Sequence, residues 1–301
     1  MALLGTRAGD AKARWADTVR FGFRRMYQLR LGVLGALLLT LLVVAAIFAP
    51  FIATHDPYSQ TITQRLVPPV FLEGGSAAHL LGTDQLGRDL FSRIVYGARV
   101  SLIVGIGAVC LSTAIGVMLG VAAGYFGGLT DTVISFVINV MLGFPFILLA
   151  LSLVAVLGPS LVNIIIALGL TSWPVFARVT RIETMKLRDR EFVLAAMSQG
   201  LGTLRILYRH VLSNLTAPIL VIMTVEIARA IIRESLLSFL GLGVQPPIPS
   251  WGSMLAEGRN YILVVWWLTT LPGLAIFLSA LGINLVGDAL RDLTDPRMRR
   301  S

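Results

Sequence analysis

The sequence predicts an all-α integral membrane protein with six transmembrane helices. Of its 301 residues, 56% are hydrophobic and 14% are charged, whereas soluble chains carry roughly 25% charged residues. The apolar residues also gather in runs of about 20 or more, the length that a helix needs to cross a bilayer. The expected spans are residues 31–52, 100–124, 132–157, 161–179, 212–240 and 262–285.

These spans divide the chain into four parts. Residues 1–30 form a basic N-terminal segment, and residues 31–99 hold the first span and a long external loop. Residues 100–290 form a five-helix core with a cytoplasmic loop at 180–211, and residues 291–301 form a tail. The first apolar run starts near Leu31 and is too long for the core of a cleavable signal peptide, so we expect it to remain as a span.

The basic residues indicate the orientation. Seven precede the first span, seven lie at the end of the fourth span and in the loop that follows it, and four lie in the tail, against five on the opposite side. By the positive-inside rule, both termini and the 180–211 loop are expected in the cytoplasm. Because the positive charge flanks spans, the net charge of +9 needs no nucleic-acid partner.

A polar segment between the fourth and fifth spans reads EFVLAAMSQGLGTLRILYRHVLSN. Glu191 begins a stretch without proline or glycine, which predicts a short helix. Ala195 and Ala196 would give this helix a narrow face that can enter a groove on a partner. Gly200 and Gly202 are expected to end it. By themselves these residues fit an ordinary helix–turn–helix loop better than a docking site, but their position between the fourth and fifth of six spans favours docking.

Charged residues also fall inside the fifth expected span, where they are costly unless they face a partner or water. Glu226, Arg229 and Arg233 are spaced to share one helix face, and Glu234 follows them. Two explanations remain open: a structural ion-pair cluster, or the lining of a translocation path.

The segments on the external side predict local structure. Thr83 or Asp84 is expected to cap a short helix that starts at Gln85, with Asp89 and Arg93 one turn apart. Aromatic residues near the last span suit the outer membrane–water interface; they are Trp251, Tyr261, Trp266 and Trp267.

Nothing in the sequence indicates catalysis or a cofactor. The only cysteine, Cys110, lies in an apolar run, and His55, His79 and His210 lie in separate segments, so we expect no metal site. The chain has no GxxxxGK[ST] phosphate loop, so ATP and Mg²⁺ would be bound by partner subunits.

The loop motif LAAMSQG occurs together with HLLGTDQLGRDLFSRIVYGARVSL at 79–102, LSFLGLGVQPPIPSWGSML at 237–255 and NLVGDALRDLTDPR at 284–297. In these four segments the chain resembles the second, C-type permease subunit of dipeptide/oligopeptide ABC importers, a family that includes nickel and glutathione importers. Two positions depart from the family pattern: Leu194 stands where glutamate is usual, and Ser213 where proline is common.

The resemblance implies a type I ABC permease fold in a prokaryotic plasma (inner) membrane. It implies ATPase coupling through the 191–200 helix and its flanks, at Glu191, Leu194, Ala195, Ala196, Gly200 and Gly202. It also implies that the fifth span borders the translocation path, with Glu234 at a commonly acidic position. The implied partners are a homologous second permease, one or two ABC ATPase subunits and an extracytoplasmic solute-binding protein.

Other functions stay open at this stage. The same architecture could import nickel complexes or glutathione instead of di- or oligopeptides. A channel or secondary transporter would explain the charges in the fifth span but not the coupling loop. A membrane-embedded enzyme would need a cluster of catalytic groups, and only those same charges qualify.

Overall fold

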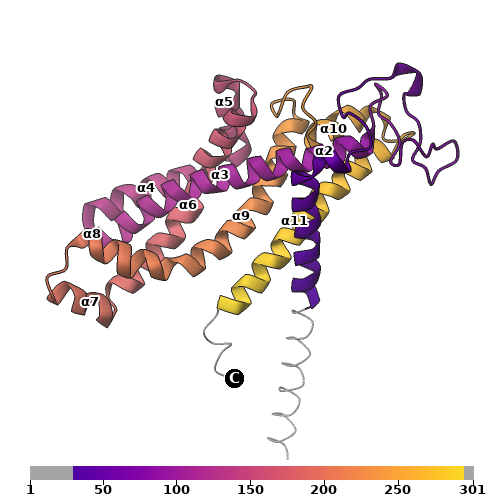
Figure 1. Cartoon of the computed structure of the whole chain (residues 1–301). Coiled ribbons are helices and arrows are strands. Elements are labelled where there is room, and N and C mark those ends of the chain that lie inside the picture. Colours follow the sequence, from indigo (N-terminus) through magenta and orange to yellow (C-terminus); the bar gives the residue numbers. More distant parts are fainter. Residues whose placement is uncertain (1–29, 295–301) are drawn as a thin grey trace, which may run out of the picture.

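A computed structural model describes residues 30–294 of the chain, and within this range the ordered elements are helices (Figure 1). The predicted N-terminal segment up to residue 29 and the tail from residue 295 lie outside the described residues. The elements are a first helix (Arg30–Ile47), α2 (Ala49–Ile52), α3 (Leu90–Phe126), α4 (Gly128–Gly143), α5 (Phe146–Leu157), α6 (Leu161–Arg188), α7 (Glu191–Ser198), α8 (Thr203–Ile206), η2 (Leu207–Leu212), α9 (Ser213–Phe239), α10 (Trp251–Gly258) and α11 (Trp267–Thr294), with single 3₁₀ turns at Ile62–Gln64 and Arg259–Tyr261.

Helices α3 and α6 form the closest pair in the bundle, because α3 carries a stripe of small residues. Every fourth residue on one buried face of α3 is small: Ala108, Ser112, Gly116, Gly120 and Gly124. A Cβ atom at Gly116 would lie 2.5 Å from Cβ of Phe176 and 2.6 Å from the carbonyl oxygen of Trp173. In lipid, where the hydrophobic effect does not drive helices together, such small residues permit the close backbone approach that holds two helices.

The contacts along this pair show that α3 and α6 run in the same direction. Leu111 packs against Gly169, Gly116 against Phe176, and Gly124 lies beside Thr184. If two parallel helices both span the bilayer, the chain between them must return across it. Helices α4 and α5 together are long and apolar enough to form this return span, which would be the sixth beside five single-helix spans. The predicted all-α fold is confirmed.

The third span nevertheless differs from the single helix expected at 132–157. It is broken between Gly143 and Phe146, where α5 leaves the direction of α4 at 92° (Figure 1). Pro145 lacks a backbone N–H and disfavours helical geometry in the residue before it, so Phe144 takes an extended conformation with ψ 136°. Because of this break, α5 turns away from α4 and packs beside the first part of α6, where Ala150 joins Ile164 and Leu168 in one buried cluster.

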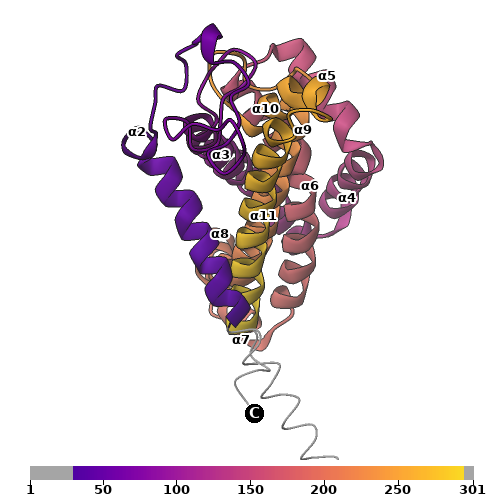
Figure 2. The same cartoon turned by 90° about the vertical axis from the view of Figure 1, so that its right-hand side faces the viewer.

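The bundle has two distinct ends (Figure 2). One carries α7, the start of the first helix and the end of α11. The other carries α10 and the long 53–89 segment that precedes α3. We call them the α7 end and the α10 end. Helix α6 and the continuous helix Thr203–Phe239 run between the two ends and flank α7 in the sequence.

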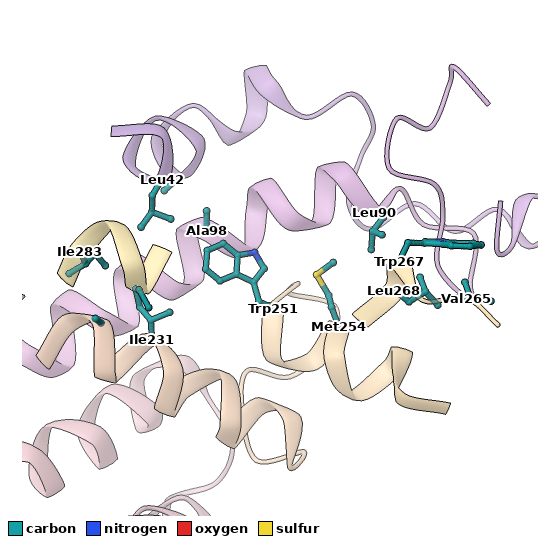
Figure 3. Packing of buried hydrophobic residues seen from close by; sticks show 13 residues of the cluster. Leu42, Leu90, Ala98, Ile231, Trp251, Met254, Val265, Trp267, Leu268 and Ile283 are labelled. Carbon is teal, nitrogen blue, oxygen red and sulfur yellow. The ribbon is translucent and has the colours of Figure 1, made fainter. Parts of the chain in front are cut away.

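The core at the α10 end is built around Trp251 (Figure 3). Its indole is 2% exposed, packs between Ala98 and Ile231, and donates from Nε1 to the carbonyl oxygen of Ile94 at 2.9 Å. Trp267 is also buried in this cluster. The expected interfacial position is therefore wrong for these two tryptophans, whereas Trp266 is 40% exposed. Ser250 caps α10 and directs Trp251 inward, which the aromatic content alone does not indicate.

Candidate functional site

Helix α7 is positioned by contacts with its own chain. Arg190 is its N-cap, and the backbone turns at Gly200, whose φ of +76° favours glycine. Val193 and Ala196 are buried against Ile206 of α8 and form a small cluster of their own. The predicted short helix is thus present, and it ends at Ser198.

The surface that α7 presents outward is apolar. Phe192, Leu194 and Met197 are 43%, 49% and 38% exposed, and Ala195 lies among them. Ala196 faces inward and is 4% exposed, so the expected face shared by Ala195 and Ala196 is not formed. The reason is that Val193 and Ala196, three residues apart, share the side that packs onto α8. Glu191, Gly200 and Gly202 are exposed at the two ends of α7.

Three charged residues of α9 meet inside the membrane-spanning region. Glu226 is 1% exposed; its Oε1 accepts from Nη1 of Arg229 at 2.7 Å and its Oε2 accepts from Nη1 of Arg233 at 3.2 Å. One carboxylate thus binds two guanidinium groups on the face that the spacing predicts. The cluster carries a net charge of +1, and the side chain of Arg229 remains 54% exposed.

The two arginines differ in their further contacts. Arg233 donates to Oγ of Ser172 in α6 at 2.8 Å and lies 4.2 Å from the ring centroid of Phe146, the first residue of α5. Arg229 has no side-chain partner other than Glu226 among the interactions of the described residues. Glu234 does not join this cluster: it is fully buried and accepts from Oγ of Ser238 at 2.7 Å.

A second charged network lies at the α10 end, where the predicted cap proves wrong. Helix α3 begins at Leu90 and is capped by Asp89, which accepts from the backbone N–H of Ser92 at 2.8 Å. Asp84 instead closes a turn and binds the guanidinium groups of Arg88 and Arg93 at 2.6 Å each. Arg93 is therefore paired with Asp84, not with Asp89 one turn away.

Glu257 of α10 completes this network. Its Oε2 lies 2.6 Å from Nη2 of Arg88 and 3.2 Å from Nη2 of Arg93. Burial raises the pKa of Glu257, although the positive charge of Arg88 acts against this shift. The network joins the start of α3 to α10, and both of its arginines are engaged in buried pairs.

His55, His79 and Asp89 also converge at the α10 end, which corrects the expectation that the histidines stay apart. Nδ1 of His79 lies 2.9 Å from Oδ1 of Asp89, and Nδ1 of His55 lies 3.7 Å from the same oxygen. The two imidazole rings are 4.6 Å apart. Burial raises the pKa of Asp89, but hydrogen bonds from Ser92 and His79 outweigh it and leave the pKa below its usual value.

A wide apolar groove lies toward the α7 end. It has a volume of about 760 Å³ and runs between α3 and the α8–η2–α9 segment. Val117, Met118, Phe126, Leu204, Tyr208 and Ile219 are among its lining residues. Leu204 and Tyr208 are 82% and 77% exposed, so this side of the bundle is apolar and uncovered within the described chain.

Comparison with protein-family models assigns the chain to a family. Residues 116–300 match the model described as "Binding-protein-dependent transport system inner membrane component". The chain belongs to this family. Residues 15–69 match the N-terminal transmembrane domain of oligopeptide transport permease C, so this inner membrane component is of the C type predicted from its motifs.

Curated relatives match almost the whole chain. A di/tripeptide transport system permease protein of Pseudomonas aeruginosa is 47% identical over 90% of this chain and 89% of its own length. A dipeptide transport system permease protein of Alkalihalophilus pseudofirmus is 44% identical over 93% and 90%. A probable D,D-dipeptide transport system permease protein of Escherichia coli is 40% identical over 89% and 88%.

A solved structure shares the fold. The match is to a chain of the MetNI methionine ABC transporter in an inward-facing conformation. Its TM-score is 0.54 at 16% identity, covering 67% of this chain and 97% of that chain. This inner membrane component therefore has the transmembrane fold of an ABC transporter, in agreement with the predicted fold class.

Proposed function

We propose that this chain is one of two permease subunits of an ATP-driven importer of small peptides. The observation that carries the proposal is the 47% identity to a di/tripeptide permease over nine-tenths of both chains. Identity at this level over nine-tenths of the chain covers the membrane core as well as the loop motifs. The MetNI fold match supports the transporter class independently of the peptide names.

The energy for transport would come from partner ATPases. The sequence contains no phosphate loop, so ATP and Mg²⁺ would bind to other subunits. Helix α7 offers a contact for them, because Phe192, Leu194 and Met197 project an apolar surface from the end of the bundle. A surface of this kind fits a partner groove and is costly to leave in water.

This arrangement supports one orientation in the membrane. The α7 end would face the cytoplasm and the α10 end would face the external solute-binding protein. Arginine and lysine residues support this orientation: the 180–211 loop around α7 carries six, whereas Arg88 and Arg93 at the α10 end are neutralised in buried pairs. The exposed apolar groove between α3 and α9 would be covered by the second, homologous permease.

The charged cluster of α9 would border the peptide path. The half-exposed guanidinium of Arg229 has donors beyond the one that Glu226 accepts, so it can bind the terminal carboxylate of a peptide. Arg233 is held by Ser172 and Phe146 and would keep Glu226 in place. Glu234 is buried among serines of its own chain, which argues for a structural role.

Affinity purification tests the assembly. The full-length tagged chain, extracted from its host membrane in mild detergent, should retain ATPase subunits that carry a phosphate loop. Leu194→Asp should lose these ATPases and keep the second permease, because the change affects only the exposed face of α7. Ile62→Asp is the matched control, because Ile62 is 70% exposed in the 53–89 segment at the α10 end, away from α7. Purification without any ATPase would point to a channel or a secondary transporter.

A further inference from the structure

The three residues that converge at the α10 end supply the donor types of a transition-metal site. His55 follows α2, His79 lies in the long 53–89 segment, and Asp89 caps α3. One ligand atom from each lies within 4.8 Å of the other two. Two imidazoles and a carboxylate are typical ligands of Zn²⁺ and related divalent ions.

The two oxygens of Asp89 have separate partners. Oδ2 accepts from the backbone N–H and the hydroxyl of Ser92, at 2.8 and 2.7 Å, and from the hydroxyl of Thr54 at 3.3 Å. Oδ1 faces the two histidines. The capping contacts therefore fix the carboxylate and leave one oxygen directed at the imidazoles.

His79 has an oxygen partner at each of its two ring nitrogens. Nε2 lies 3.1 Å from the side-chain oxygen of Gln64, so a ring that carries its proton on Nε2 can donate to Gln64. Nδ1 then directs its lone pair at a carboxylate oxygen 2.9 Å away. In this tautomer Nδ1 of His79 and Oδ1 of Asp89 can bind the same metal ion.

The dimensions of the cluster accommodate a metal ion. Ligands about 2.0–2.1 Å from a tetrahedral Zn²⁺ lie about 3.3 Å from one another. The distances from Oδ1 of Asp89 to Nδ1 of His79 and of His55, 2.9 and 3.7 Å, lie on either side of this value. The His55 side chain is 39% exposed and so provides access from water, whereas Asp89 is buried.

The hydrogen-bond partners of the three ligands also resemble those found around known metal sites. A ligating histidine usually donates its other ring N–H to an oxygen, which fixes the ring, and Gln64 is placed to accept from His79. The backbone N–H of His55 donates to Oγ of Ser92 at 3.0 Å and holds its segment against α3. We propose that His55, His79 and Asp89 bind a divalent transition-metal ion with a water molecule as the fourth ligand. The ion links the 53–89 segment to the start of α3.

Metal titration of the full-length chain in lipid nanodiscs tests this site, with Zn²⁺ and Co²⁺ as probes. Competition with a chromophoric chelator should give one Zn²⁺ per chain, and Co²⁺ should show the visible absorption of four-coordinate nitrogen and oxygen ligation. His55→Gln should weaken Zn²⁺ binding at least ten-fold, and its exposure makes misfolding an implausible cause. Asp89→Asn, which keeps a capping side chain, should do the same.

His210→Gln is the matched control, because it removes the one other histidine of the chain, in the η2 segment. It should leave Zn²⁺ binding unchanged. The site is refuted if the wild-type chain binds no more Zn²⁺ than the His55→Gln/His79→Gln double variant. It is also refuted if millimolar Zn²⁺ leaves the nuclear magnetic resonance signal of the His79 ring unchanged.

Discussion

The guanidinium of Arg233 lies over the ring of Phe146, 4.2 Å from its centroid. This contact joins the charged cluster of α9 to the break in the third span, because Phe146 is the first residue after Pro145. A cation–π contact shielded from water contributes about 2 kcal/mol. A movement of α9 that shifts Arg233 would therefore act on the α4–α5 break as well as on Ser172 of α6.

Variants of the Glu226–Arg229 ion pair test most sharply whether this cluster borders the peptide path. Removing Glu226 leaves two arginines without their shared carboxylate, so Glu226→Gln should destabilise the protein by about 3–5 kcal/mol. Arg229→Gln should be milder, because Arg233 still pairs with Glu226. Thermal unfolding in detergent measures both effects.

The uptake of peptides separates the two roles of Arg229. If it binds substrate, Arg229→Gln should assemble normally and reduce transport by roughly ten-fold, the loss expected for one charge-assisted hydrogen bond. Peptide amides, which lack the terminal carboxylate, should be transported equally by the wild type and by Arg229→Gln. Equal transport of free-acid peptides by both chains would make the pair purely structural.

The glycine stripe of α3 predicts a strong effect of one methyl group. Gly116→Ala places Cβ 2.5 Å from Cβ of Phe176 and should destabilise the α3–α6 pair by about 1–3 kcal/mol. Gly143→Ala is the control, because an added Cβ there meets no atom within 4 Å. A lower midpoint of thermal unfolding for Gly116→Ala than for Gly143→Ala is expected. Equal midpoints would mean that α3 and α6 are not in close backbone contact.

The two neighbouring alanines of α7 should respond differently to arginine. Ala196→Arg forces a charge against Val193 and Ile206, so limited proteolysis should cut the loop around α7 faster. Ala195→Arg leaves the loop intact and should uncouple ATP hydrolysis from transport. The docking face is misassigned if Ala196→Arg keeps the protease resistance of the wild type while Ala195→Arg loses it.

Cysteine labelling in intact cells tests the orientation. In a Cys110→Ser background, a membrane-impermeant maleimide should react with Gln60→Cys, in the exposed segment at the α10 end. It should reach Gln199→Cys, beside α7, only after the cells are permeabilised. The reverse pattern would invert the topology and exclude the proposed contact between α7 and cytoplasmic ATPases.

Features with a local cause were predictable from the sequence. The spans follow from apolar runs, α7 from Glu191 and Gly200, and the shared face of Glu226, Arg229 and Arg233 from helical spacing. The break at Pro145 had a signal too, since proline disfavours helix in the residue before it, but the apolar run on both sides concealed it.

Features that depend on the path of a loop were not predictable in this way. Asp84 and Asp89 are equally suitable caps in sequence, and the choice depends on Arg88, Arg93 and the distant Glu257. His55 and His79 are 24 positions apart in a segment with no helical or strand period, so only the fold brings them to Asp89. Trp251 is buried for the same reason, since Ala98 and Ile231 come from other helices.

ATP-driven uptake in proteoliposomes tests the central proposal most directly. The chain is reconstituted with the permease and ATPase subunits that co-purify with it, and with the solute-binding protein, and accumulation of a radiolabelled dipeptide is measured. We expect accumulation that requires ATP and is lost in Leu194→Asp, whose lipid insertion is unchanged. Dipeptide entry at equal rates with and without ATP, or in Leu194→Asp as in the wild type, would contradict an ABC importer coupled through α7.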